Sequence, residues 1–251
     1  MTIKEITDLL KAPVSAEVLA ELKADDRKGV QKLLAAYEKR MVQLAEKKAG
    51  FEKRMQLERK YWAEGKVVAG IDEVGRGPLA GPLVVCAAIL KHDFNLLDVN
   101  DSKQVSRSKR ELLYDQILEQ VVDYKIIVKS SQDVDKYNPL EADRMAMKEA
   151  AETLSVRPDI LLVDAVKVNT DIPQVDMNKG DSISNSIAAA SILAKVYRDN
   201  LMKEYAKQYP EYGFEKNAGY GTADHLAALK KYGPTPIHRL SYDPVKKSLK
   251  N

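Results

Sequence analysis

Short apolar runs alternate with helical segments from residue 66 to the end of the chain, and this alternation constrains the fold more than any other feature. Five runs have the length and composition of strands, namely "KVVAGID", "PLVVCAAIL", "DYKIIVKS", "DILLVDA" and "IPQVD". Helices are expected from Ser106 or Ser108, over 139–154, over 181–209 and over 222–232. The pattern predicts an α/β domain with a mixed sheet flanked by helices and a helical C-terminal part.

The first 65 residues have a different texture, because their apolar residues recur at helical spacing and hardly any strand-like run occurs. We expect a helical N-terminal extension over 1–65, with breaks at Pro13 and Gly50, and a catalytic domain over 66–251. Residues 1–66 contain 15 Lys and Arg against 11 Asp and Glu. This basic excess suits either a polyanion such as nucleic acid or a solvated helix face, and both interpretations remain open.

Composition excludes several classes of protein. Of the 251 residues, 45% are hydrophobic and 31% charged, which is typical of a folded globular chain and not of a disordered one. A single cysteine, Cys86, cannot form an intramolecular disulfide, and no apolar run approaches the length of a membrane helix. We therefore expect a cytoplasmic protein without a membrane partner.

A glycine-rich loop, "GRGPLAG", follows the first apolar run and could suggest phosphate binding. The spacing of its glycines matches neither a P-loop nor a dinucleotide-binding loop. Both of those motifs are followed by a helix, whereas this loop is followed by a strand-like run. The chain has no G-x-S-x-G elbow, and three histidines with one cysteine make a zinc site improbable.

Carboxylates at the ends of apolar runs are the remaining candidates for chemistry. Asp72 and Glu73 end one run, Asp164 ends another, and Asp181 precedes the long helix. Strands deliver their terminal residues to the rim of a sheet, where clustered acids need hard cations such as Mg²⁺ or Mn²⁺. Such a site favours two-metal phosphoryl chemistry. Alternatively, Asp181 is a helix cap and Asp164 a loop acid. Adjacent strand residues point to opposite faces, so Asp72 and Glu73 share a site only if the strand ends or distorts there.

Six motifs in order resemble the bacterial ribonuclease HII family over residues 67–245: "GIDEVGRGPLAGPLV", "NDSKQVS", "LLVDA", "KGDSISNSIAAASILAKVYRD", "AGYGTADHLAAL" and "HRLSYDPV". The resemblance implies an RNase H-like mixed sheet with a helical C-terminal extension. It also implies an endonuclease that uses Mn²⁺ or Mg²⁺ to cut RNA in RNA/DNA hybrids and to cut 5′ of single ribonucleotides embedded in duplex DNA.

The resemblance assigns roles to individual residues. Metal binding and catalysis fall to Asp72, Glu73, Asp164 and Asp181, and recognition of the ribonucleotide 2′-hydroxyl to Gly75, Arg76 and Gly77. Glycines without a Cβ let a backbone approach a sugar closely, and an arginine suits a phosphate. Tyr220 is expected to stack on the sugar after the ribonucleotide, although a core or hydroxyl-bonding tyrosine is the alternative. Backbone phosphate contacts are expected from Lys103, Lys195 and Arg198, although such residues are often only solvated.

Two positions depart from the family pattern, and two other functions compete with the one implied. Ala218 stands where the family usually has a lysine, which puts one phosphate contact in doubt, and Val105 replaces a leucine conservatively. The first competitor is a ribonuclease HIII-like hybrid nuclease, but this chain has "GRG" and a helical N-terminus. The second is a non-catalytic hybrid-binding protein, in which four acids without metal would repel the ligand. We expect a monomer.

Overall fold

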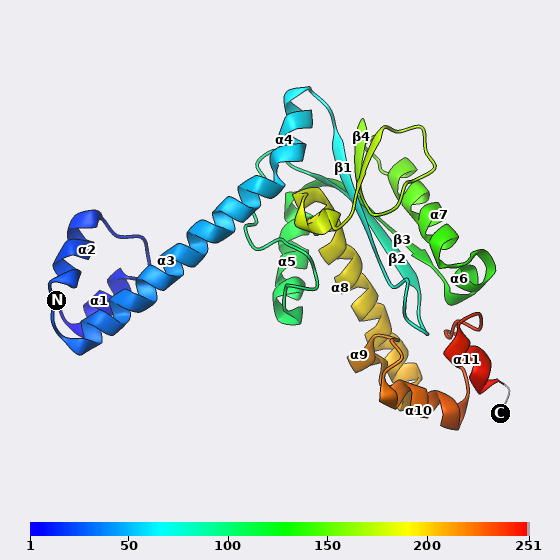
Figure 1. The fold of residues 1–251 in the computed structure, drawn as a ribbon. Coiled ribbons are helices and arrows are strands. Elements are labelled where there is room, and N and C mark those ends of the chain that lie inside the picture. Colours follow the sequence, from blue (N-terminus) through cyan, green and yellow to red (C-terminus); the bar gives the residue numbers. More distant parts are fainter. Residues whose placement is uncertain (250–251) are drawn as a thin grey trace. The chain divides into compact units, whose positions relative to one another are not determined.

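The chain divides into two compact units, Met1–Glu52 and Lys53–Asn251 (Figure 1). This division comes from a computed structural model that describes residues 1–249. Each unit has its own buried core and is described separately below.

The first unit consists of helices only. It contains α1 (Ile3–Leu9), α2 (Ala16–Lys23) and most of α3 (Lys28–Arg54). Its core consists of six buried residues with apolar or aromatic side chains, namely Ile6, Leu10, Leu22, Val30, Leu34 and Tyr37. Pro13 lies between α1 and α2, as expected. The expected break at Gly50 is wrong, because α3 continues through it to Arg54.

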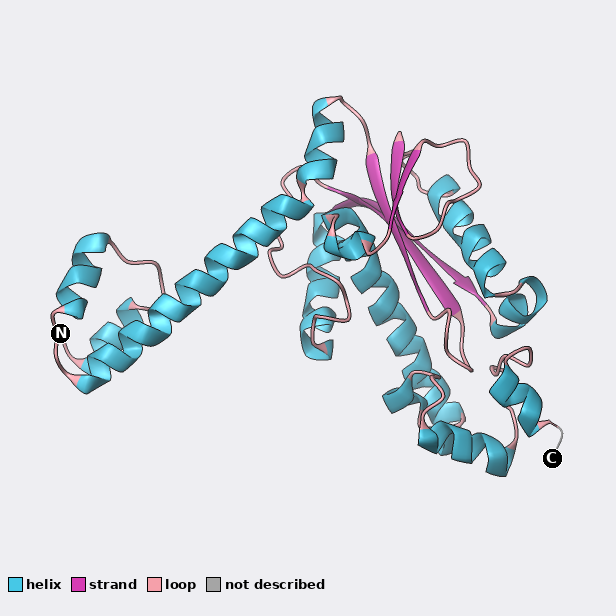
Figure 2. Ribbon diagram, viewed as in Figure 1, coloured by secondary structure: helices cyan, strands magenta, loops and turns pink. Residues whose placement is uncertain are grey.

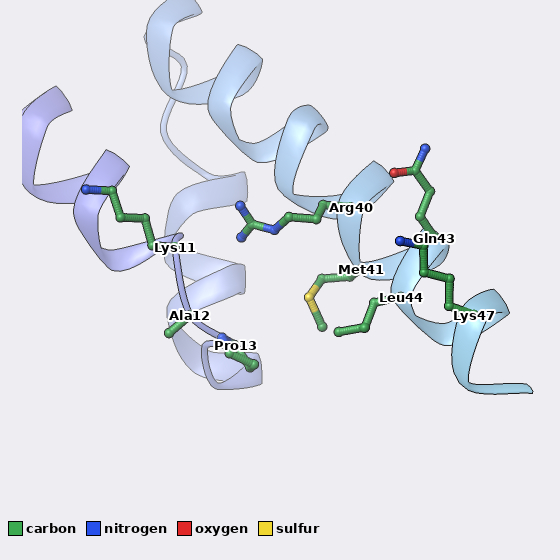
Figure 3. A pocket seen from close by; sticks show the side chains of 8 residues that line it. All are labelled: Lys11, Ala12, Pro13, Arg40, Met41, Gln43, Leu44 and Lys47. Carbon is green, nitrogen blue, oxygen red and sulfur yellow. The ribbon is translucent and has the colours of Figure 1, made fainter. Parts of the chain in front are cut away.

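A groove of about 320 Å³ lies on this unit between the end of α1 and the middle of α3 (Figure 3). Its lining combines apolar side chains with three cations and consists of Lys11, Ala12, Pro13, Arg40, Met41, Gln43, Leu44 and Lys47. None of the residues predicted to act in catalysis lines it.

The second unit is built on a five-stranded mixed sheet in the order β3-β2-β1-β4-β5 (Figure 2). Its strands are β1 (Val68–Val74), β2 (Leu83–Leu90), β3 (Val121–Lys129), β4 (Ile160–Asp164) and β5 (Gln174–Met177). Strands β1, β2 and β3 pair antiparallel, whereas β4 pairs parallel with both β1 and β5. All five strands expected from the sequence are present, and the predicted α/β class is confirmed.

Helices cover both faces of this sheet (Figure 1). On one face, α7 (Pro139–Glu152) buries four side chains against alternate residues of β1, β2 and β4. On the other face, α8 (Asn185–Gln208) lies directly on β1 and β2. A Cβ on Gly70 would lie 2.2 Å from the backbone of Ser186, so the missing side chain is what lets α8 approach β1 this closely.

The remaining helices complete the second unit. Helix α4 (Gln56–Ala63) packs Leu57, Tyr61 and Trp62 beside the start of α8. Helix α5 (Arg107–Gln120) contacts α8, and α6 (Ser131–Tyr137) contacts α7. At the C-terminal end, α9 (Phe214–Asn217), α10 (Ala223–Tyr232) and α11 (Asp243–Ser248) form the predicted helical extension around a separate apolar cluster. Among the described residues, no helix has both the length and the apolar character that crossing a membrane requires.

One expected helix start is confirmed and another needs correction. Helix α5 begins after Ser106, one of the two starts expected, although the spacing of Ser108 and Glu111 does not mark a capping box. Helix α8 begins after Ser184, whose hydroxyl accepts a hydrogen bond from the Ile187 amide. Asp181 lies four residues before α8, in the short 3-10 helix η1 (Gly180–Ser182), so it is not the cap of the long helix.

Candidate active site

The carboxylates of Asp72, Glu73 and Asp164 meet at one edge of the sheet. The parallel pairing of β1 with β4 aligns Ile71 with Val163, so the next residues along the two strands are Asp72 and Asp164. One carboxylate oxygen from each of Asp72, Glu73 and Asp164 lies within 4.8 Å of the other two. These three acids, called the acid cluster below, are spaced to share a cation.

Within the acid cluster, Glu73 and Asp72 start from opposite faces of the sheet. Asp72 shares the α8 face with Val68 and Gly70, whereas Glu73 shares the α7 face with Ile71. Strand β1 does not end at these residues, because Glu73 and Val74 still pair with β2. Pairing of β1 with β4 stops at Ile71, however. We expected the two adjacent acids to share a site only if the strand ends or distorts there. Strand β1 does not end, and the acids come together where β1 has no pairing with β4 beyond Ile71.

Asp181 lies near the acid cluster but outside the 4.8 Å group. Burial, followed by the neighbouring carboxylates of Asp101 and Asp164, raises its pKa to about 6. The amide of the preceding residue, Gly180, donates a 2.7 Å hydrogen bond to Oδ1 of Asp164. The turn before α8 thus places Asp181 near the cluster and orients Asp164 through the Gly180 amide.

Burial and mutual repulsion favour the protonated forms of Asp72 and Glu73 in the absence of a cation. Burial is the main cause that raises the pKa of Asp72 well above its usual range, followed by the charge of Glu73. Burial also raises the pKa of Glu73 to about 7, with Asp143 as the next cause. A divalent cation would replace these protons and remove the repulsion, so the donor set fits a metal of the hard, oxygen-binding kind.

Lys103 faces the acids from the loop before α5. Burial disfavours its charged ammonium group, but Asp101, Asp181, Asp72 and Asp164 outweigh this effect and raise its pKa. A cation so close to the acids is positioned for a phosphate that enters the site, and this role stays a prediction.

The G-R-G loop adjoins both the acid cluster and Tyr220. Arg76 Nη1 lies 3.5 Å from Oε1 of Glu73. The nearest atom to a Cβ built on Gly77 would be Cε1 of Tyr220, at 3.8 Å. Gly75 has a φ of +97° and lies against the Arg198 side chain, so any larger residue there would be strained and would clash. Tyr220 is 46% exposed, which excludes the alternative of a core tyrosine.

Two buried arginines fix the backbone of this loop through hydrogen bonds to its carbonyl groups. Arg198 donates hydrogen bonds to the carbonyls of Ala80, Pro82 and Ala218. Arg239 donates to the carbonyls of Gly75, Arg76 and Gly81. Both side chains are fully buried. Burial, together with the positive charge of Arg239, lowers the pKa of Arg198 to about 10.

The phosphate contact expected of Arg198 is therefore corrected. A guanidinium with no exposed surface does not meet a phosphate from solvent, and its N–H groups are used by backbone carbonyls. Arg198 instead connects the loop after β1 to the segment before Tyr220.

Lys195 remains accessible beside a small basic cavity. Its ammonium lies 2.6 Å from Asp199, and its side chain is 20% exposed. The cavity measures about 170 Å³, and its lining includes Arg107, Arg110, Lys195, Lys216 and Ala218. Ala218 has a left-handed φ of +49° and its carbonyl accepts from Arg198. Lys216 lines the same cavity. A cation is therefore present two residues before Ala218, the position where the family usually has a lysine.

Sequence reasoning missed three residues at this site: Asp143, Gly180 and Arg239. Gly180 precedes a predicted acid in "KGDSISN", and Arg239 belongs to "HRLSYDPV", so both lay in recognised motifs without an assigned role. Asp143 lies in α7 and carries no motif signal. Only its complete burial beside Arg76 identifies it.

Comparison with known proteins extends this picture over the whole chain. The family model described as Ribonuclease HII matches residues 69–245, and the model described as Ribonuclease HII N-terminal domain matches residues 2–62. A Ribonuclease HII from Lactobacillus delbrueckii subsp. bulgaricus is 57% identical over 246 residues, which are 98% of this chain and 96% of that protein.

Solved structures agree with this similarity. The ribonuclease H2 from Pyrococcus horikoshii superposes with a TM-score of 0.64 at 27% identity, covering 73% of this chain and 97% of that one. The structure of Bst-RNase HIII in complex with Mn²⁺ gives a TM-score of 0.58 at 19% identity, covering 74% and 70%, and this likeness concerns the fold alone. Both family models and the 57% identical relative carry the HII name, not the HIII name that we considered as an alternative. The chain therefore belongs to the ribonuclease HII family of RNase H endonucleases.

Proposed function

We propose that this enzyme hydrolyses the RNA strand of RNA/DNA hybrids and cuts 5′ of single ribonucleotides embedded in duplex DNA. The observation that carries the proposal is the adjacency of two features on one sheet edge. The acid cluster lies beside Arg76, and Gly77 of the same loop lies against Tyr220. A cutting site and a sugar-reading site this close together couple recognition of a ribonucleotide to cleavage next to it.

Two Mn²⁺ or Mg²⁺ ions would be held by Asp72, Glu73, Asp164 and Asp181. When bound, these ions would supply an activated water as the nucleophile and positive charge to stabilise the phosphate during its hydrolysis. The three-acid group and the raised pKa values of Glu73 and Asp181 support this assignment. The acids themselves provide negative charge and fixed oxygen ligands.

The 2′-hydroxyl is the group that separates RNA from DNA at a single nucleotide. We propose that the backbone at Gly75 and Gly77 reads it and that Arg76 contacts an adjacent phosphate. Tyr220 would pack on the next deoxyribose, because its ring is exposed and lies beside Gly77. Lys103 and Lys195 are proposed to contact phosphates farther along the backbone.

We further propose that the enzyme works as a monomer in the cytoplasm. The buried free thiol of Cys86 supports a reducing compartment. We propose that its partner is a nucleic-acid duplex.

The decisive experiment incubates the purified protein with a DNA duplex that carries one ribonucleotide, in Mn²⁺, in Mg²⁺ and in EDTA. We expect cleavage only with metal, on the 5′ side of the ribonucleotide, leaving 3′-hydroxyl and 5′-phosphate ends, and no cleavage of an all-DNA duplex. A 2′,3′-cyclic phosphate would contradict the proposal, because it would mean that the substrate's own 2′-hydroxyl attacked.

Two substitutions test the metal ligands in the same assay. Asp72→Asn and Asp164→Asn each remove a negative charge with little change in volume, so we expect cleavage to fall by at least about a hundredfold while the fold is kept. Asp176→Asn on the neighbouring strand β5 is the matched control, because this acid is exposed. Wild-type turnover in either test variant would remove that residue from the site.

A further inference from the structure

Asp143 is a fully buried acid without a hydrogen-bond partner. Its side chain has no exposed surface, and neither carboxylate oxygen has a hydrogen-bond partner among the described residues. The other buried positions of α7 are apolar: Ala142, Ala146, Met147, Ala150 and Ala151. Because a buried polar group without a partner costs stability, an acid in this row calls for a reason other than packing.

The closest cation to Asp143 is Arg76 of the G-R-G loop. Arg76 Nη1 lies 3.7 Å from Oδ2 of Asp143 and 3.5 Å from Oε1 of Glu73, so one guanidinium nitrogen is shared between two carboxylates. Burial raises the pKa of Asp143 to about 7, and the charge of Arg76 opposes this rise. Asp72 on β1, Arg144 on α7 and Asp164 on β4 also influence the pKa of Asp143. The charge of Asp143 in turn raises the pKa of Glu73.

We propose that Asp143 is a positioning residue that holds Arg76 in place to contact a phosphate of the nucleic acid. The inference rests on the proposed function, in which Arg76 meets a phosphate and Glu73 binds metal. Arg76 is 38% exposed, so its outer part is open to solvent and depends on its inner contacts for a fixed position. Asp143 provides such a contact from a helix that is itself fixed against the sheet.

The two acids that flank Arg76 would respond differently to a bound cation. When a cation binds Glu73, part of the negative charge that attracts Arg76 is neutralised. Asp143 lies outside the acid cluster and keeps its attraction for the guanidinium. Asp143 should therefore matter more for the position of Arg76 when a divalent cation is bound than when none is bound.

The experiment is a double-mutant cycle on nucleic-acid binding. Anisotropy of a labelled duplex with one ribonucleotide is measured for the full-length wild type, Asp143→Asn, Arg76→Ala and the double variant, in EDTA and in Ca²⁺, with cleavage monitored in the same samples. Glu149→Gln is the control, because it removes one acid from the same helix at an exposed site. Asp143→Ser tests the same loss of charge if the asparagine variant does not fold.

We expect Asp143→Asn to weaken binding about three- to tenfold, and more in Ca²⁺ than in EDTA, without lowering the melting temperature. In the Arg76→Ala background the same change should have no further effect, and Glu149→Gln should bind as the wild type does. Equal losses in both backgrounds, or no loss where Arg76→Ala weakens binding, would overturn the positioning role. Unchanged binding by Arg76→Ala would overturn the phosphate role of Arg76 and this inference together, and metal-dependent cleavage in the wild type would still support the rest of the proposed function.

Discussion

At the scale of single residues, burial decides what each charged group can do. Arg198 and Lys195 lie three residues apart on α8, yet the first is fully buried among backbone carbonyls and the second reaches a solvent-accessible cavity. Glu73 shows the same effect on an acid, since burial raises its pKa to about 7. The acids of the candidate site are thus held at a cost to the folded state that a bound metal would relieve.

This cost predicts how the stability of the metal-free protein depends on pH. The pKa of Glu73 is higher in the folded protein than its ordinary value of 4.5, so the folded state keeps this proton to higher pH. The contribution of Glu73 to stability is therefore present below about pH 4.5 and is lost as the pH rises through about 7. Because the pKa rises from 4.5 to about 7, the wild type should lose about 3 kcal/mol relative to Glu73→Gln over this window.

Urea unfolding of both proteins in EDTA between pH 4.5 and 8 measures this difference. Mn²⁺ at pH 8 should restore the stability of the wild type more than that of Glu73→Gln. Parallel pH profiles for the two metal-free proteins would show that Glu73 does not carry a raised pKa.

At the scale of elements, the G-R-G loop and the segment between α9 and α10 lie together and form the surface that we propose recognises the ribonucleotide. Arg198 donates to carbonyls on both segments, and Leu79 N donates to the carbonyl of Gly219 at 2.8 Å. The two segments are 140 residues apart in sequence but are held at a fixed separation. Tyr220 therefore has a defined position relative to Gly77.

From this fixed position we predict that Tyr220→Ala lowers cleavage at a single ribonucleotide in DNA by about one to two powers of ten. Removal of an aromatic stack costs on the order of 1 to 3 kcal/mol on a base, and a sugar contact should cost no more. A continuous RNA/DNA hybrid should be affected less, because it offers no deoxyribose at that position.

Tyr220→Phe is the matched control for this prediction, since it keeps the ring and removes only the hydroxyl. It should behave like the wild type on both substrates. Equal losses on both substrates in Tyr220→Ala would assign the residue a structural role, and the reading of the junction would belong to another side chain.

At the scale of the whole molecule, the basic excess of the N-terminal region lies mostly outside the first compact unit. Residues 1–52 hold 10 Lys and Arg against 9 Asp and Glu, whereas residues 53–66 hold five against two. The second stretch also belongs to the second unit by its contacts. Arg54 donates to Val99 and Asn185, and Glu58 accepts from Ser184 and from the amide of Ser186.

We therefore predict different results from two truncations. A chain of residues 53–251 should fold and bind the duplex with nearly the wild-type salt dependence, because only one net positive charge is lost. A chain of residues 61–251 should be destabilised by at least about 3 kcal/mol, because it lacks buried Glu58 and the apolar contacts of α4.

Urea unfolding and a salt titration of duplex binding measure both effects. A clearly shallower salt slope for residues 53–251 would instead show that the first unit contacts phosphates. A stable 61–251 chain would show that α4 is dispensable for the catalytic fold.

The sequence by itself determined which segments become strands and helices in the second unit and which acids lie at the sheet margin. These features depend on local sequence, because strand alternation, helical spacing and capping each involve residues that are only a few positions apart. The resemblance to the family motifs added the roles that we propose for the acids and for the G-R-G loop, since six motifs occur in the family order.

Only the tertiary structure decided which of these residues meet. The register of β1 against β4 brings Asp72 level with Asp164, 92 positions away, and the unpaired margin beyond Ile71 lets Glu73 join them. Burial is also decided by contacts between distant segments. Asp143 and Arg198 look like ordinary charged helix residues in the sequence, and packing against the sheet and the loops is what removes them from water.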